Sequence, residues 1–213
     1  MAENSKIEWT HHTFNPWEGC TKIGPGCDHC YAETRNNRFG GGNWGSGAPR
    51  RKTSESNWRL PIKWSKQAAA SGVRYRVFCA SLADVFDNEV DPQWRVELFQ
   101  LIKQTPNLDW LLLTKRIGNA RAMLPDDWGR GYPNVWLGAT VVNQEEAARD
   151  MPKLLSTPAA IRWLSMEPLL APVDFAGMWV DHENPAAHQN MLEALDWIVL
   201  GGESGPGARP MHP

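Results

Sequence analysis

Five short apolar segments recur along the C-terminal two thirds of the chain, and in four of them a tryptophan comes first. The successive tryptophans of these four segments are 26, 27 and 34 residues apart, so the pattern is a quasi-repeat. Continuous apolar runs of this length are typical of strands buried on both faces of a parallel sheet. We therefore predict strands at Val77–Ser81, Trp110–Thr114, Trp136–Thr140, Trp163–Glu167 and Trp197–Gly201.

Helical patterns alternate with these segments. They cover 91–104, 119–123, 144–155 and 186–195, and alternation of this kind predicts right-handed βα units around a parallel sheet. Another strand is expected within 9–14. Six strands are too few for a closed eight-stranded barrel, so the predicted α/β fold is a partial, open TIM-like βα barrel. A doubly wound flat sheet is the alternative. We expect residues 1–213 to form one domain and a final βα unit to be missing after Pro213.

Three of the four cysteines lie within eleven residues of one another, in a C-x6-C-x2-C array formed by Cys20, Cys27 and Cys30. A disulfide would leave one of the three unpaired, and the chain shows no secretory signal. Structural zinc is a second interpretation, because His12 or His29 could complete a tetrahedral site. An iron–sulfur cluster is the third. With only three cysteines, one iron keeps a position for another ligand.

Polar residues follow the predicted strands at their carboxyl ends, where parallel βα folds place their binding sites. Because the cysteines follow the first strand, they are expected at the same rim. The rim residues are Ser81, Asp84, Thr114, Lys115, Arg116, Thr140, Asn143, Gln144, Ser165, Glu167, Gly201, Gly202, Glu203 and Ser204.

The segment Cys27–Ala32 resembles the second half of the cysteine motif of radical S-adenosylmethionine (SAM) enzymes, although the first spacing is six residues rather than the usual three. The wider chain is similar to the phage-associated three-Cys-motif proteins, a radical-SAM-like group. The stretches that carry this resemblance are 13–20, 81–84, 113–116, 164–169 and 201–207.

The resemblance implies a fold of radical-SAM type and a [4Fe–4S] cluster on Cys20, Cys27 and Cys30. It also implies reductive cleavage of SAM to a 5′-deoxyadenosyl radical, which needs a reducing electron donor. The rim would then bind SAM. Asp84 is the candidate for the methionyl amine, and Glu203 for an amine or a ribose hydroxyl. Lys115 and Arg116 are expected to neutralise a carboxylate or phosphate, or else to pair with Glu167 or Asp84.

The charge of −2 is unevenly distributed along the chain. Between Arg35 and Arg76 ten Lys or Arg accompany one acid, Glu55, so this basic, Gly- and Trp-rich insertion carries +9 and the rest −11. Three tryptophans interleave with these charges, which favours a nucleic-acid or nucleotide substrate. A solvated basic loop is the plain alternative. A non-enzymatic, zinc-stabilised nucleic-acid-binding module is the alternative function.

No apolar run approaches membrane-spanning length, so no membrane contact is expected. Reduced thiols that bind metal indicate a cytoplasmic protein. Together with the resemblance, this predicts a location in the cytoplasm of a bacterium or of a phage-infected host.

Overall fold

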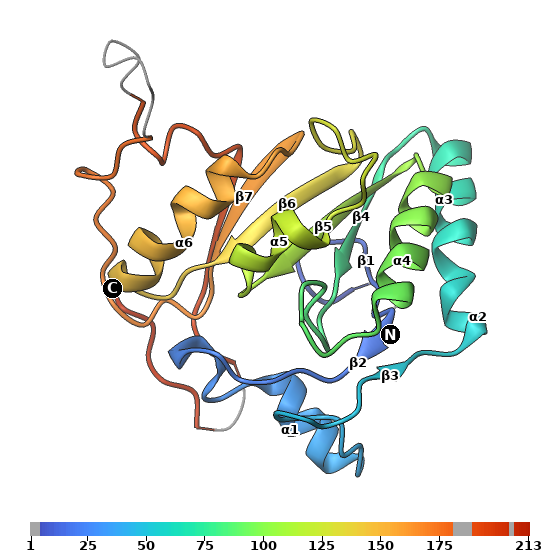
Figure 1. Ribbon diagram of the computed structural model, residues 1–213, viewed down its shortest axis with the longest axis horizontal. Helices are drawn as coiled ribbons and strands as arrows, with labels where there is room; N and C mark the ends of the chain where they lie inside the picture. The colour runs from blue at the N-terminus through green and yellow to red at the C-terminus, as the bar shows by residue number, and fades with distance from the viewer. Residues whose placement is uncertain (1–4, 181–188, 205–206) are drawn as a thin grey trace.

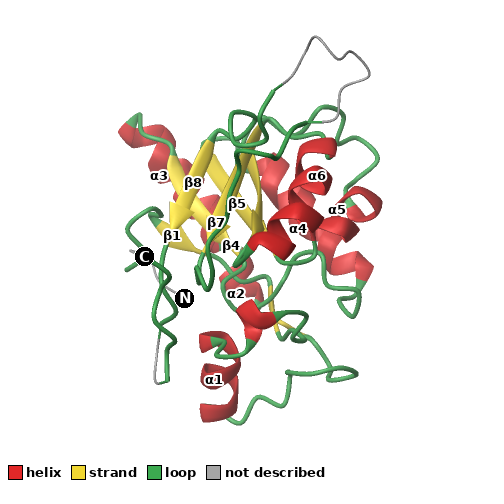
Figure 2. Cartoon of the chain, turned by 90° about the vertical axis from the view of Figure 1, so that its left-hand side faces the viewer, coloured by secondary structure: helices red, strands yellow, loops and turns green. Residues whose placement is uncertain are grey.

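The computed structural model describes residues 5–180, 189–204 and 207–213. Its centre is a six-stranded, entirely parallel sheet with the order β1-β4-β5-β6-β7-β8. The sheet curls into a half-barrel that is open between β1 and β8 (Figures 1 and 2). Its strands are β1 (His12–Thr13), β4 (Tyr75–Cys79), β5 (Leu108–Thr114), β6 (Val135–Thr140), β7 (Ile161–Met166) and β8 (Trp197–Leu200).

All six predicted strands are confirmed, with ends that differ by a few residues. Their order in space follows their order in the chain without a reversal. A doubly wound sheet requires such a reversal, because its two halves run outward from a central switch point. The partial βα barrel is therefore confirmed, and the flat doubly wound alternative is wrong.

Four helices cover the outer face of the sheet: α3 (Leu60–Ser71), α4 (Pro92–Gln104), α5 (Ile117–Met123) and α6 (Gln144–Ser156). Their ends follow from local chemistry. The Asp91 side chain accepts from the Gln93 N–H before α4, and the Asn143 side chain accepts from the Glu146 N–H before α6. Helix α3 ends at Gly72, whose φ of 69° is left-handed.

The helix expected over 186–195 is wrong in the part that the structure describes. Residues 181–188 lie outside the described residues. In 189–195 there is no helix: Asn190 forms a β-bridge with Trp179, and 191–194 form a turn. Asn190 explains part of this. Its side chain accepts from the Leu192 N–H two residues later, which is a local bond that competes with helix formation.

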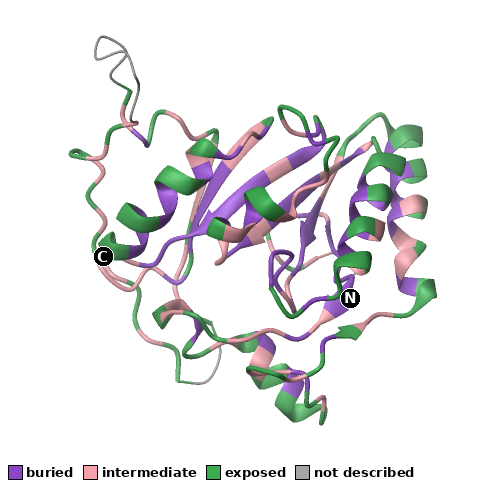
Figure 3. Cartoon of the chain, in the orientation of Figure 1, coloured by how far each residue is buried: buried purple, intermediate pink, exposed green. Residues whose placement is uncertain are grey.

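The hydrophobic core lies between the sheet and its outer helices (Figure 3). Trp64 of α3 and Trp110 of β5 are both completely buried there. A smaller cluster under α6 contains Val141, Met151 and Leu164. β5 and β6 are buried on both faces along most of their length, and most of their residues are accordingly apolar rather than alternating with polar ones.

The inner face of the half-barrel carries aromatic rings. Trp9 packs edge-on against Phe78 of β4, Trp163 of β7 and Trp197 of β8, with ring centroids 5.0, 5.4 and 5.8 Å away. Gly138 of β6 leaves room for the Trp163 indole, since a Cβ at this glycine would lie 2.4 Å from the ring. The rings fill the half-barrel below the carboxyl ends of the strands.

The basic insertion is built into the domain. It contains α1 (Tyr31–Arg38), β3 (Arg51–Lys52), α2 (Glu55–Trp58) and α3. β3 pairs antiparallel with β2 (Trp17–Glu18), and α3 lies on β4 and β5. Among the described residues, no helix is long and apolar enough to cross a membrane.

Candidate functional site

A cavity of about 820 Å³ lies at the carboxyl ends of the strands. Cys20, Cys27 and Cys30 all line it, which confirms that the cysteine loop, residues 20–30, and the strand ends meet at one rim. The predicted rim residues in its wall are Ser81, Asp84, Thr114, Lys115, Arg116, Thr140, Ser165, Glu167, Gly202, Glu203 and Ser204. Gly201 lies beside the cavity, beneath the Glu167 side chain.

The cysteine loop rests on the segment that joins β6 to α6. A short 3-10 helix, η1 (Pro25–Cys27), carries the second cysteine, and Cys30 occupies the N-cap position of α1. Two glycines permit the close approach. A Cβ at Gly24 would lie 2.7 Å from Glu146 Oε1, and one at Gly26 would lie 2.7 Å from Val142 Cγ1. The glycines between the first two cysteines therefore bring the loop down onto the rim.

All four cysteines are free, so the disulfide interpretation is wrong. The three cavity thiols share a wall, but among the described residues no three His, Cys, Asp or Glu side chains form a group that could hold a metal ion. The histidines considered for zinc are engaged elsewhere. His12 stacks on Trp64 at 4.2 Å, and His29 Nδ1 lies 3.1 Å from Glu203 Oε2.

Arg116 holds the first cysteine. Its guanidinium donates to Cys20 Sγ at 3.3 Å and to the Thr21 carbonyl at 2.7 Å, and it pairs with Asp84 at 3.4 Å. Burial and, less strongly, the Asp84 charge raise the pKa of the Cys20 thiol to about 11, although Arg116 opposes the shift. Without a metal, this cysteine is a neutral thiol.

Asp84 is a structural hub of the rim. Its carboxylate accepts from Thr114 Oγ1 at 2.7 Å, from the Lys115 N–H at 3.0 Å and from the Phe86 N–H at 2.9 Å, and only 5% of the residue is exposed. Together with its pairing to Arg116, these contacts occupy most of its acceptor capacity. The pairing interpretation of Arg116 is therefore confirmed.

Lys115 and Glu167 face the cavity with opposite charges. Lys115 Nζ donates to Thr140 Oγ1 at 3.3 Å. Glu167 extends over Gly201, where a Cβ would lie 3.0 Å from its Cδ. Burial raises the pKa of Glu167, and the charge of Lys115 partly offsets the shift. In the described part of the chain no ion pair joins these two side chains, so both keep capacity for a ligand.

The Glu203 carboxylate accepts hydrogen bonds from Arg209, a residue that no sequence pattern indicated. Arg209 donates to it from its backbone N–H at 2.8 Å and from its guanidinium at 2.5 and 3.0 Å. These bonds lower the pKa of Glu203 to about 2. The same guanidinium reaches Asp28 at 3.1 Å and the Pro25 carbonyl at 2.7 Å. The C-terminal segment is thus fastened to the cysteine loop.

Many cations of the basic insertion form ion pairs with acidic residues of the same chain. Arg35 and Arg51 pair with Glu18, and Lys52 pairs with Glu97. Arg50 is buried and pairs with Asp87 and Glu89. The other internal pairs are Arg59 with Glu55 and Arg74 with Asp109. At least six of the ten cations therefore have acidic partners among the described residues. A residue count between 35 and 76 does not reveal this, because most of those acids lie outside the segment.

Fold and site together define a parallel βα half-barrel whose cysteine-lined cavity opens at the carboxyl ends of its strands. Residues 4–213 match the family described as "Protein of unknown function (DUF5131)", and the chain belongs to this family. No curated protein matches the chain. No solved structure matches it either.

Proposed function

We propose that this protein is a radical-SAM-type enzyme in which Cys20, Cys27 and Cys30 hold a [4Fe–4S] cluster. One observation carries the proposal: the three cysteines and the strand-end polar groups line the same cavity at the carboxyl edge of a parallel half-barrel. The resemblance to the phage-associated three-Cys-motif proteins supports the same activity.

The chemistry of the donor set fits such a cluster. Three free thiols lie on one cavity wall, and three thiolates would leave one iron with a position for a different ligand. Because the thiols do not yet converge on one point, cluster loading requires their side chains to turn toward a shared centre. Cluster binding also deprotonates the thiols, which favours the thiolate of Cys20 despite its burial.

When bound, the cluster would pass one electron from an external reducing donor to SAM, whose sulfur–C5′ bond would break to give methionine and a 5′-deoxyadenosyl radical. The protein positions the reactants and excludes water. In this proposal Lys115 holds a carboxylate and Glu167 accepts from an amine, while Thr140 and Ser204 offer hydroxyl groups. Gly201 and Gly202 allow close backbone approach. Asp84 acts indirectly, by fixing Arg116, Thr114 and the Lys115 backbone.

The proposed substrate is a nucleotide or a nucleotide unit of a nucleic acid. The cavity, at about 820 Å³, lies within the range of roughly 300–1,000 Å³ found for small-molecule sites. Trp44 and Tyr31 in its wall provide aromatic faces for a base, and Lys22 also lines the wall, where it pairs with Glu33 at 2.8 Å. The proposed location is the reducing cytoplasm.

Anaerobic reconstitution with iron and sulfide tests the proposal. The expected result is about four irons per chain, an iron–sulfur chromophore and release of 5′-deoxyadenosine from SAM on reduction. Replacement of Cys20, Cys27 or Cys30 by Ala should abolish all three readouts. Cys79→Ala is the matched control, because Cys79 is buried in β4 outside the cavity wall.

Uptake of zinc with no iron chromophore would contradict the proposal. It would favour instead the non-enzymatic zinc-stabilised nucleic-acid-binding module. That module would have to bind nucleic acid with a surface whose cations are largely paired.

A further inference from the structure

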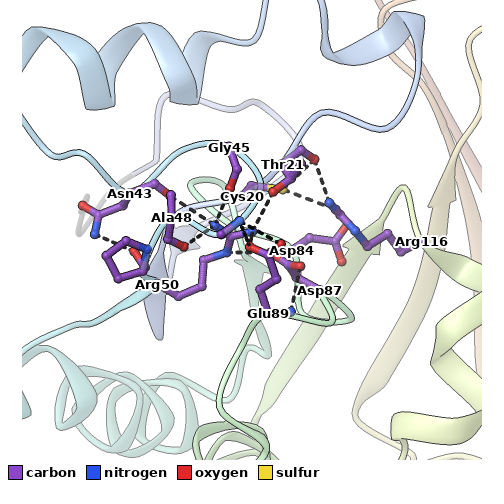
Figure 4. A network of polar contacts seen from close by, with 12 residues as sticks. Cys20, Thr21, Asn43, Gly45, Ala48, Arg50, Asp84, Asp87, Glu89 and Arg116 are labelled. Atoms are coloured by element: carbon purple, nitrogen blue, oxygen red, sulfur yellow. Dashed lines mark hydrogen bonds and ion pairs between the residues drawn. The ribbon is translucent and has the colours of Figure 1, made fainter.

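Two arginine side chains hold the Cys20–Thr21 step from two sides (Figure 4). Arg116 donates to Cys20 Sγ and to the Thr21 carbonyl, as described above. Arg50 donates from its other side to Thr21 Oγ1 at 2.8 Å. Arg116 lines the cavity, whereas Arg50 lies behind the cysteine and does not contribute to the cavity wall.

Arg50 is itself anchored at every donor position. Its side chain is 1% exposed. Nε donates to Asp87 at 2.8 Å, and Nη2 pairs with Glu89 at 2.8 Å. Nη1 donates to three backbone carbonyl groups, at 3.4, 3.2 and 2.9 Å, which belong to Asn43, Gly45 and Ala48. One guanidinium thereby joins the 43–48 loop, Thr21 and the 87–89 turn.

The loop that Arg50 holds returns directly to the cysteine. The Gly45 N–H donates to the Cys20 carbonyl at 2.9 Å, and Cys20 pairs with Trp44 in an isolated β-bridge. Gly19 shows how tight this packing is. Its φ is +113°, and a Cβ there would lie 2.4 Å from the Asn43 carbonyl oxygen and 3.0 Å from Arg50 Cδ. The backbone at Cys20 therefore packs against a loop that Arg50 holds through three of its carbonyl groups.

We infer that Arg50 is a positioning residue for Cys20, which fixes the cysteine from behind while Arg116 contacts its sulfur from the cavity side. The inference deepens the proposed function, because Cys20 is one of the proposed cluster ligands. It stands on its own geometry, however, and its first test uses no cluster. A lysine at position 50 would keep one positive charge but lose the planar fork that reaches six partners.

The first test labels the metal-free, full-length protein with N-ethylmaleimide at constant pH, well below the melting temperature, and follows each cysteine by mass spectrometry. Arg50→Lys and Thr21→Val are the variants. We expect Cys20 to react about tenfold faster in Arg50→Lys, because losing charge-assisted bonds allows local opening. Thr21→Val should give a smaller increase, and Cys30 should stay within about twofold of the wild-type rate.

Arg51→Lys is the matched control. Arg51 is the next residue and pairs with Glu18, but its side chain is 60% exposed. Its replacement should leave the Cys20 rate unchanged. Thr21→Val keeps the proposal testable if Arg50→Lys fails to fold, because it removes only the hydrogen bond between Arg50 and Thr21 and keeps the Arg50 side chain. Unchanged Cys20 rates in both variants, or parallel increases at Cys20 and Cys30, would overturn the inference.

The second test reconstitutes the same proteins with iron and sulfide and measures iron per chain and reduction potential. Arg50→Lys should hold less iron or show a shifted potential, since sulfur hydrogen bonding and geometry both tune such clusters, whereas Arg51→Lys should match wild type. The two proposals fail separately. If wild type takes up no iron, the proposed function falls and the labelling result still decides the role of Arg50. If wild type loads normally and Arg50→Lys matches it in both tests, the inference falls alone.

Discussion

Gly138→Ala tests how the inner face of the half-barrel is packed. Gly138 pairs with Trp163 across β6 and β7, and an added Cβ would lie 2.4 Å from two atoms of the indole. An ordinary contact is at least 3.4 Å, so the ring or the strand has to shift by about 1 Å. Trp163 is completely buried and lies against Trp9 and Trp197. The ring therefore has no open space to move into.

The expected cost follows from opposing contributions. Overpacking of a well-filled core costs about 1–3 kcal/mol. A shift of the indole also weakens its hydrogen bond to the Trp136 carbonyl, now 3.2 Å, which contributes about 0.5–1.5 kcal/mol. In the opposite direction, alanine lowers the conformational entropy of the unfolded chain, which stabilises the folded protein by about 0.4–1 kcal/mol. The net loss is about 2 kcal/mol, which for a chain of this size lowers the melting temperature by about 4–8 °C.

Urea unfolding followed by tryptophan fluorescence and by far-UV circular dichroism measures this loss. Gly118→Ala in α5 is the control, since its Cβ would meet Lys153 at an ordinary 3.6 Å and alanine favours the helix by up to about 1 kcal/mol. Trp163→Leu should relieve the clash, so the double variant should lose less than the sum of the singles. Stability of Gly138→Ala within about 0.5 kcal/mol of wild type would refute the packing argument.

Three further changes test other parts of the structure. Glu203→Gln should abolish a pH-dependent contribution to thermal stability. Because the pKa of Glu203 is about 2 in the folded protein and 4.5 ordinarily, this contribution is complete above pH 4.5 and is lost as the pH falls toward 2. Equal acid sensitivity of the wild-type and variant proteins would contradict this. Asn143→Ala should cost about 1 kcal/mol by removing the α6 cap, as urea unfolding would reveal, and an unchanged midpoint would argue against the cap. Asp84→Asn should lower the melting temperature by several degrees, because Arg116 loses its buried ion pair and keeps a side chain that is only 8% exposed; a neutral result would show that the hub is dispensable.

The strands and the location of the site were predictable from the sequence for a common reason. Each apolar run is long enough to form one strand of the sheet. In parallel βα folds the carboxyl ends of all strands lie at the same rim. Thr114, Thr140 and Glu167 could therefore be assigned to one site although they are distant in sequence. The helix predicted over 186–195 failed in its described part because local side-chain bonds such as that of Asn190 are not visible in hydrophobic spacing.

The sequence could not predict which charged side chains at the site are buried and paired, because their partners are brought together only by folding. Arg50 and Arg51 are neighbours with identical chemistry, yet their side chains are 1% and 60% exposed. The difference arises because Asp87, Glu89 and three loop carbonyl groups converge on Arg50 alone. A basic segment in the sequence thus separates into cations that build the cysteine loop and cations that reach solvent. Only the second group can add to affinity for a polyanion, since counterion release requires accessible charge. The +9 of the insertion therefore overstates the charge that is available to a nucleic acid. In the proposed function, substrate recognition rests on the cavity charges that keep capacity for a ligand, above all Lys115 and Glu167.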